Sequence, residues 1–193
     1  MPTKQRRGEE TKQRLLDAAL KAHESGDFTV QSVLAESGVS LGSLYHHFTS
    51  FDGLAAALYA QCMAELLDRI VEALERARTA RTGIQAVVTA YLTFVKDESP
   101  KARFIHASAY ANYLPTHAAM IAETKAPRMA RMAAWLAPHV AAGTVVDLPD
   151  PLTEMLLIGP VAELSRRWLN DPGIDLTKAA KLLPPRIWSA LRP

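Results

Sequence analysis

Apolar residues recur at spacings of three and four along almost the whole chain, and this periodicity most limits the folds available to it. Leu54, Leu58, Leu66, Ile70 and Leu74 illustrate the pattern, since they are separated by four residues or by multiples of four. This spacing places side chains on one face of an α-helix, whereas a half-buried strand needs strict alternation, and alternating runs are scarce. The sequence therefore predicts an all-α protein.

Capping residues and turn glycines divide the pattern into separate helices. A first helix should end near Gly26, and Thr29, Ser40 and Ser50 have the side chains that cap the next three helices. Prolines inside the last three helices should kink or split them. The helices expected after Ser50 cover about residues 51–78, 82–97, 100–112, 115–141, 151–170 and 175–191.

The composition narrows the class of protein further. A chain of 193 residues, nearly half of them apolar, is long enough to bury a core. Cys62 is the single cysteine, which excludes an internal disulfide and suits a reducing compartment. We find neither an apolar run long enough to span a membrane nor a signal peptide, and we expect a cytoplasmic protein without a membrane partner.

The segment GVSLGSLYHHF carries the clearest functional signal, because it makes a short, hydroxyl-rich third helix. Three short helices joined by tight turns are typical of a helix-turn-helix DNA reader, whose third helix enters the major groove. Leu41 suits contact with a thymine methyl group, and Ser43 suits hydrogen bonds to base edges. Tyr45, His46 and His47 lie a turn later, where they can reach phosphates.

Two other segments suit phosphate contacts. Thr29 and Gln31 stand at the N-terminus of the second helix, where the helix dipole attracts anions. Residues 1–14 carry five basic and two acidic side chains, a net charge of +3, although a solvated terminus would explain this equally well. Residues 15–49 cancel the excess, so charge alone does not establish DNA binding.

TKQRLLDAAL and FTVQSVLAESGVSLGSLYHHFTSFDGLAAAL together resemble the DNA-binding region of the tetracycline-repressor (TetR) family of bacterial regulators, over about residues 10 to 60. The resemblance implies a homodimer that represses transcription from double-stranded operator DNA until a small molecule binds. It also implies a helix-turn-helix domain at 1–50 and a helical effector-binding and dimerisation domain at 51–193. The DNA-binding positions that carry over are Thr29, Gln31, Ser40, Leu41, Gly42, Ser43, Tyr45 and His46.

The chain departs from the family pattern at three places. Leu41 and Phe51 stand where many members have a lysine, and the stretch HESGDFTVQ between the first two helices is a few residues shorter than usual. The two missing charges predict a shallower salt dependence of DNA binding than a typical relative would show.

An effector cavity should be mostly apolar, with a few polar groups that orient the ligand. The segment RFIHASAYANYLPTH combines aromatic and hydrogen-bonding side chains and is the best candidate lining, although its aromatics would also suit a core. We expect a largely hydrophobic ligand with one or two hydrogen-bonding groups. The candidate ligand-binding residues are Met63, Leu66, Phe94, Phe104, His106, Tyr110, Tyr113 and Trp135.

The last two long helices carry more apolar surface than the outer helices of a monomer need, which predicts a four-helix interface between two subunits. The candidate interface residues are Leu156, Val161, Leu164, Trp168 and Trp188.

Two other functional classes remain open at this point. One is a structural or nucleoid DNA-binding protein of the same fold that binds no ligand, and the other is a helical enzyme. We find no convergent catalytic residues at a telling spacing, and we expect neither enzyme activity nor a cofactor. We also expect no metal, because the adjacent His46 and His47 point about 100° apart on a helix and cannot share one ion.

Overall fold

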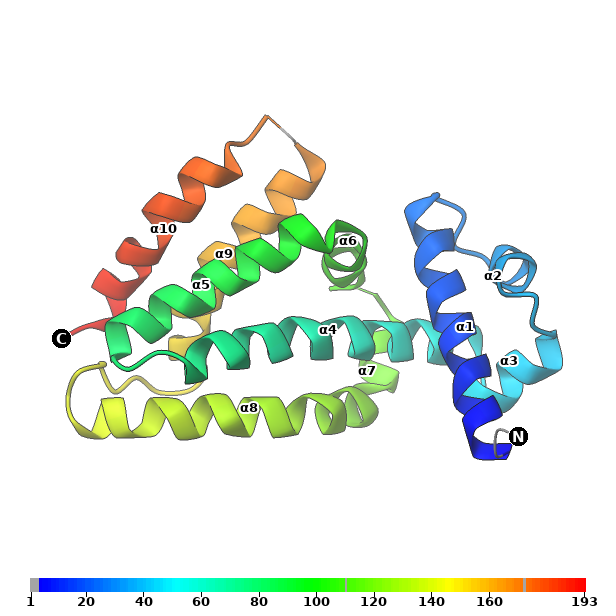
Figure 1. The fold of residues 1–193 in the computed structure, drawn as a ribbon, viewed down its shortest axis with the longest axis horizontal. Helices are drawn as coiled ribbons and strands as arrows, with labels where there is room; N and C mark the ends of the chain where they lie inside the picture. Colours follow the sequence, from blue (N-terminus) through cyan, green and yellow to red (C-terminus); the bar gives the residue numbers. More distant parts are fainter. Residues whose placement is uncertain (1–3, 110, 172) are drawn as a thin grey trace. The chain divides into compact units, whose positions relative to one another are not determined.

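The computed structural model describes residues 4–109, 111–171 and 173–193, and it consists of helices joined by turns and by a longer connection at 142–151 (Figure 1). These residues contain no strand, so the prediction of an all-α fold is confirmed. The helices are α1 (Lys4–Glu24), α2 (Val30–Ser37), α3 (Leu41–Phe48), α4 (Phe51–Glu75), α5 (Ala80–Asp97), α6 (Ser99–Ser108), α7 (Tyr113–Thr116), α8 (Ala118–Ala141), α9 (Leu152–Asn170) and α10 (Leu176–Leu191).

The sequence predicted these helices well, with differences at their ends. The helix expected at 115–141 is two helices, because the backbone leaves helical geometry at His117, where φ is −110° and ψ is 16°. The prolines do not split their helices, since α8, α9 and α10 each continue through theirs, and the expected kinks stay a prediction. No described helix has the length and hydropathy that crossing a membrane requires.

Contacts divide the chain into two compact units. The first unit contains the residues up to Met63 together with Phe104–Thr124, and the second contains Ala64–Arg103 and Lys125–Pro193. α4 contributes its first half to one unit and its second half to the other as one continuous helix. The domain boundary expected near residue 50 falls in the turn between α3 and α4, and it stays a prediction.

In the first unit, α1 packs against α2 and α3 (Figure 1). The apolar stripe of α1, represented by Leu15 and Leu16, is buried together with Val33 of α2 and Leu44 and Phe48 of α3. Burial of these side chains removes apolar surface from water and fixes α3 against the other two helices.

The first unit also contains a cluster of aromatic side chains. Phe28, in the turn after α1, lies 4.9 Å from Phe51 and 5.6 Å from Phe104 between ring centroids. His23 of α1 contacts the same group, 4.9 Å from Phe104 in an edge-to-face arrangement. Phe51, one of the departures from the family pattern, thus packs against aromatic rings in this chain.

The second unit is built around α5, which packs against α9 and α10, and these two helices also contact each other (Figure 1). Its core includes Val87 and Val88 of α5, Val161 of α9, and Ile187 and Leu191 of α10.

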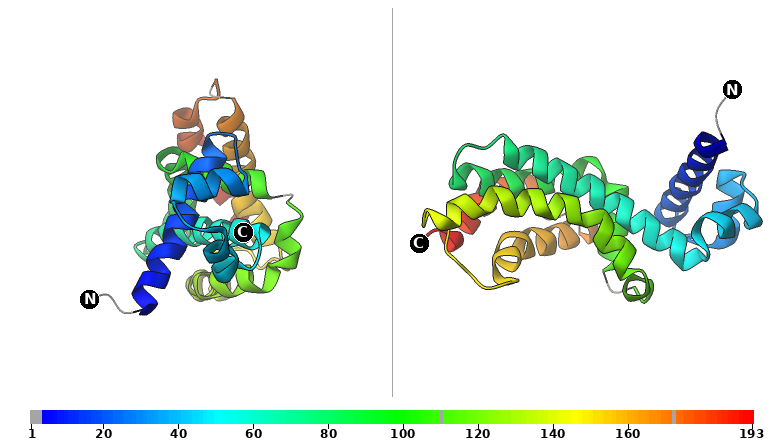
Figure 2. Two further views of the ribbon diagram at one scale, coloured as in Figure 1. Left: turned by 90° about the vertical axis from the view of Figure 1, so that its right-hand side faces the viewer. Right: turned by 90° about the horizontal axis from the view of Figure 1, so that it is seen from below.

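In the same unit, α8 runs along α4 (Figure 2) and is joined to it by charged pairs. Arg128 donates to both carboxylate oxygens of Asp68, at 2.8 and 2.7 Å. Arg131, one turn later, binds Glu75 in the same way, at 2.8 and 2.6 Å. Such two-pronged bonds fix geometry as well as charge.

Candidate nucleic-acid interface and ligand cavity

Ser40 caps α3, as its sequence predicted. The Ser43 N–H donates to Ser40 Oγ at 3.2 Å, which satisfies a backbone donor that the first turn of a helix leaves free. The turn before it is made by Gly38, whose φ of 63° is favourable for glycine and strained for other residues. These local features fix where α3 starts after α2.

One face of α3 is buried and the other is exposed. Leu44 and Phe48 hold the inner face in the core. On the outer face, Leu41 is 46% exposed and Tyr45 is 45% exposed, although large apolar side chains are usually covered. Gly42 and His46 are exposed beside them, and open space surrounds Gly42. We call Leu41, Gly42, Tyr45 and His46 the outer face of α3.

Ser43 and His47 flank this face and are half-buried. The Ser43 hydroxyl accepts a hydrogen bond from Ser40 Oγ at 3.1 Å, so its own proton remains available to donate outward. The rings of His46 and His47 lie 5.2 Å apart at 70°. Among the described residues, no group of three or more His, Cys, Asp or Glu side chains converges in a way that would hold a metal ion.

The N-terminus of α2 is also capped as predicted. Thr29 Oγ1 accepts from the Ser32 N–H at 3.2 Å, and Gln31 is exposed next to it. Sequence reasoning missed Asp27, which accepts a hydrogen bond from the Ser32 hydroxyl. Its negative charge lies beside the N-terminus of α2, where it interacts favourably with the positive end of the helix dipole.

Two basic side chains of the N-terminal segment make bonds within the protein. Arg14 donates to the Ser37 carbonyl at 2.5 Å and so caps the C-terminus of α2. Arg6 pairs with Glu10 at 3.3 Å on the surface of α1. From Lys4 onward this segment is helix, whereas the sequence suggested a basic arm.

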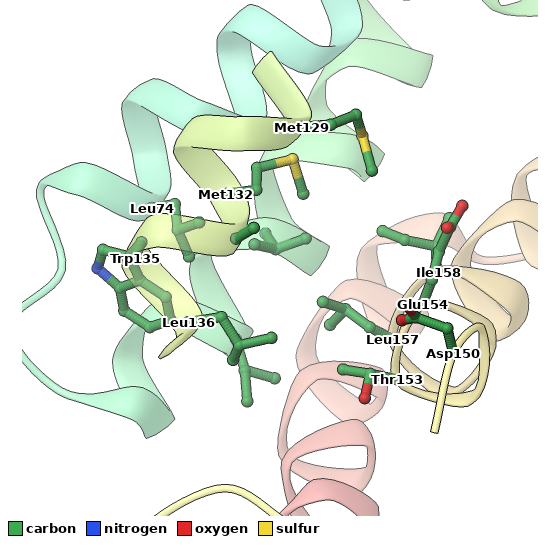
Figure 3. Close-up of a pocket in the computed structure, with 13 residues that line it drawn as sticks. Leu74, Met129, Met132, Trp135, Leu136, Asp150, Thr153, Glu154, Leu157 and Ile158 are labelled. Atoms are coloured by element: carbon green, nitrogen blue, oxygen red, sulfur yellow. The ribbon is translucent and has the colours of Figure 1, made fainter. Parts of the chain in front are cut away.

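The second unit contains a cavity of about 200 Å³ (Figure 3). Side chains of α8 form one side of it, and side chains of α9 face them from the other. Leucine, isoleucine, valine and methionine dominate the walls. The lining residues are Leu74, Ile84, Val87, Met129, Met132, Ala133, Trp135, Leu136, Asp150, Thr153, Glu154, Leu157 and Ile158.

Trp135 forms part of the wall and is positioned by a glycine of α5. A Cβ atom on Gly83 would lie 2.1 Å from Trp135 Cη2, so the absence of a side chain there makes room for the indole. On its own helix, Trp135 also lies 4.4 Å from the ring of His139.

The structure distributes the predicted ligand-binding residues over both units. Trp135 lines the cavity, and Leu66 and Phe94 are buried elsewhere in the second unit. The other described candidates belong to the first unit, and Tyr110 lies outside the described residues. These other candidates are Met63, Phe104, His106 and Tyr113.

Sequence reasoning did not identify Met129, Ala133 or Leu136, which line the cavity from α8. Met129, Met132 and Leu136 repeat at spacings of three and four, which was a detectable signal for one apolar face. Their partners across the cavity lie on α9, beyond the connection at 142–151, and no sequence pattern links the two faces.

The predicted interface residues also differ in exposure. Val161 is 0% exposed in the core of the second unit, where a partner subunit cannot reach it. Leu156 is exposed, together with Leu152 and Met155, the last of which is 59% exposed. We call these three residues the α9 apolar surface. Leu164, Trp168 and Trp188 are half-buried.

Comparison with known proteins agrees with this architecture at the level of fold. No protein-family model and no curated protein matches the sequence. A TetR family transcription regulator from Marinobacter aquaeolei VT8 superposes with a TM-score of 0.75 at 17% identity, covering 97% of this chain and 98% of its own.

Two solved FadR structures are similar to the chain as well. FadR from Bacillus subtilis, in complex with stearoyl-CoA, gives a TM-score of 0.76 at 17% identity and covers 92% of this chain and 97% of its own. The fatty acid degradation regulator FadR from Bacillus halodurans gives 0.74 at 18% identity, with 93% and 99% covered. The chain therefore has the all-α fold of TetR-family transcription regulators, with an N-terminal helix-turn-helix.

Proposed function

We propose that the protein is a homodimeric transcription regulator that binds operator DNA through α3 and leaves it when a small, largely apolar molecule binds the second unit. The outer face of α3 is the observation that carries this proposal, because it exposes Leu41 and Tyr45 at a helix whose opposite face is fixed in the core. The similar structures reported above are regulators rather than enzymes, which supports a non-enzymatic role.

The outer face suits the major groove. Gly42 allows the helix backbone to approach base edges, and Leu41 can cover a thymine methyl group. Ser43 has a hydroxyl proton to donate to a base acceptor. Tyr45, His46 and His47 follow one turn later and can reach phosphates. Thr29 and Gln31 at the N-terminus of α2, and Ser40 at the N-terminus of α3, would add further contacts to the DNA. We retain all of these residues as proposed DNA contacts.

The α9 apolar surface supports a homodimer. Leu152, Met155 and Leu156 stand on one helix and expose apolar area that a second copy would cover. Two copies would present two α3 helices to half-sites about 34–36 Å apart on one face of DNA. The operator should then be a palindrome, and repression would follow from occupying a promoter.

The cavity of the second unit supports a ligand-controlled switch. FadR from Bacillus subtilis holds stearoyl-CoA, so a similar fold accommodates a molecule with a long apolar chain. In this chain, Leu74 lines the cavity from α4, the same helix that starts at Phe51 in the first unit. A ligand with different affinities for two positions of α4 would shift the population of the DNA-binding state.

In vitro selection from random double-stranded DNA tests the proposal. The full-length protein should enrich a palindromic sequence, and the protein should repress a reporter gene placed behind that sequence. Mutating one half-site should weaken binding strongly, because the dimer then keeps one set of base contacts. Sequence-independent binding would contradict the proposal and favour a structural DNA-binding protein, and a lack of DNA binding would exclude both.

A further inference from the structure

The cavity of the second unit is lined by two acidic side chains in addition to its apolar ones. Asp150 and Glu154 line it from the side of α9, and Thr153 lies between them in sequence (Figure 3). Apolar side chains from α4, α5, α8 and α9 form the rest of the wall, and Trp135 is the largest of them. The result is an apolar chamber with acidic groups on one side.

The described lining contains neither lysine nor arginine to neutralise these carboxylates. Arg128 and Arg131 directly precede the lining residues Met129 and Met132 on α8. Each of these arginines binds a carboxylate outside the lining through both of its oxygens, Asp68 for Arg128 and Glu75 for Arg131. Asp150 and Glu154 are exposed, so water hydrates their carboxylates.

We propose that this cavity selects a lipophilic cation, an organic ammonium compound with an apolar chain or ring, and rejects carboxylates and acyl-CoA thioesters. The proposal rests on the proposed function only in taking the cavity as the effector site. The ammonium group would lie beside Asp150 and Glu154, and the apolar part would lie among Met129, Met132 and Trp135.

Physical complementarity on both sides supports this assignment. Methionine side chains adapt to irregular apolar shapes, and the indole of Trp135 adds a large apolar surface. An anionic head group at the acidic side would meet two like charges, whereas a cation would meet two opposite ones. The phosphates of a coenzyme A ester carry several negative charges, so the stearoyl-CoA held by the FadR structure has the wrong charge for this cavity.

A series of compounds with one chain and different head groups tests the charge preference directly. Calorimetric titration of the full-length protein would compare decylamine, decanol, decanoate and decanoyl-CoA below their micelle concentrations. Decylamine should bind roughly tenfold or more tightly than decanoate, and decanol should lie between them. The ratio should shrink as salt increases, because both carboxylates are solvent-exposed.

Substitutions then test whether Asp150 and Glu154 cause the preference for a cationic head group. Asp150→Asn combined with Glu154→Gln should remove the difference between decylamine and decanoate while leaving decanol binding unchanged. Glu154→Lys combined with Asp150→Asn should reverse the order. The matched control is Asp147→Asn, because Asp147 is also exposed, lies nearby in sequence and does not line the cavity. This control should keep the preference of the parent.

Equal or tighter binding of decanoate by the parent protein would overturn the proposal, and so would a lack of binding by the whole series. A preference that survives the double substitution would overturn the assignment to Asp150 and Glu154. Operator binding measured in parallel separates this proposal from the proposed function. Selective decylamine binding without any effect on DNA affinity would support the ligand class and contradict the effector role.

Discussion

The indole of Trp135 lies directly over Gly83, so that a Cβ atom on this glycine would come 2.1 Å from Cη2 and 2.3 Å from Cζ2. Contacts this short cannot persist, and the indole is a rigid ring rather than the end of a flexible chain. The position of one wall of the cavity therefore depends on a residue of α5 that has no side chain.

Gly83→Ala should destabilise the protein for this reason. Alanine improves helix propensity by about 1 kcal/mol, but displacing a packed ring costs typically about 1–3 kcal/mol. We expect a net loss of about 1 kcal/mol in the free energy of unfolding, measured by urea denaturation. Gly8→Ala in α1 is the control, because its added carbon would meet an ordinary contact at 3.8 Å and should stabilise the helix. Equal stabilisation by both substitutions would contradict the close contact.

The bond between Arg128 and Asp68 supports a second prediction. Arg128 is half-buried and donates two hydrogen bonds to one carboxylate, a geometry that lysine cannot reproduce. Arg128→Lys should lower the free energy of unfolding by about 1 kcal/mol. Arg76→Lys is the matched control, since Arg76 pairs with Glu72 on the exposed surface of α4 at 3.3 Å and should change nothing measurable. A similar loss from both would show that the two-pronged bond has no special effect.

His23 predicts a pH dependence of stability. Burial against aromatic rings lowers the pKa of His23 below its ordinary 6.5, because the charged ring loses hydration. The unfolded chain therefore binds a proton more readily than the folded protein does between the two pKa values. His23 contributes its stability fully above pH 6.5, and this contribution is lost as the pH falls through 6.5 towards the lower pKa of the folded state.

Urea denaturation at several pH values would measure this contribution. His23→Phe keeps an aromatic ring beside Phe104 and cannot titrate, so its stability should fall less than that of the parent between pH 7.5 and 5.5. His23→Gln should show the same reduced slope with lower overall stability, because the ring contact is lost. Parallel curves for the parent and both variants would exclude His23 as the source.

The α9 apolar surface predicts the effect of a charge on assembly. Leu156 is exposed, so Leu156→Glu should leave the subunit folded while placing a charge in the proposed dimer interface. Sedimentation should then show monomers, and tight operator binding should be lost. Trp168→Glu is a less direct test, because Trp168 is half-buried within its own subunit and its replacement also disturbs internal packing. A Leu156→Glu protein that remains dimeric would place the interface elsewhere.

The fold was predictable where the information is local. Thr29, Ser40 and Ser50 cap helices as their side chains indicate, and the periodicity of α4 identified its buried face. The cavity was not predictable in this way, because α4, α5, α8 and α9 contribute to it from distant parts of the sequence. Phe94 and Phe104 illustrate the difficulty, since an aromatic side chain suits a core and a ligand site equally well, and both are buried.

The outer face of α3 supports the last prediction, which separates reading of sequence from binding of the backbone. Ser43→Ala removes the hydroxyl that can donate to a base, so it should change preference at particular base pairs by about 1–3 kcal/mol at most. Tyr45→Phe removes a hydroxyl proposed to reach a phosphate, so it should weaken binding to all sequences alike. Gel-shift titrations against the selected operator and its single-base variants would measure both.

The Ser43 side chain also accepts from Ser40 Oγ, so Ser43→Cys serves as a control that keeps a side chain of similar size with a weaker donor. Equal, sequence-independent losses from Ser43→Ala and Tyr45→Phe would contradict the proposed division of roles along α3.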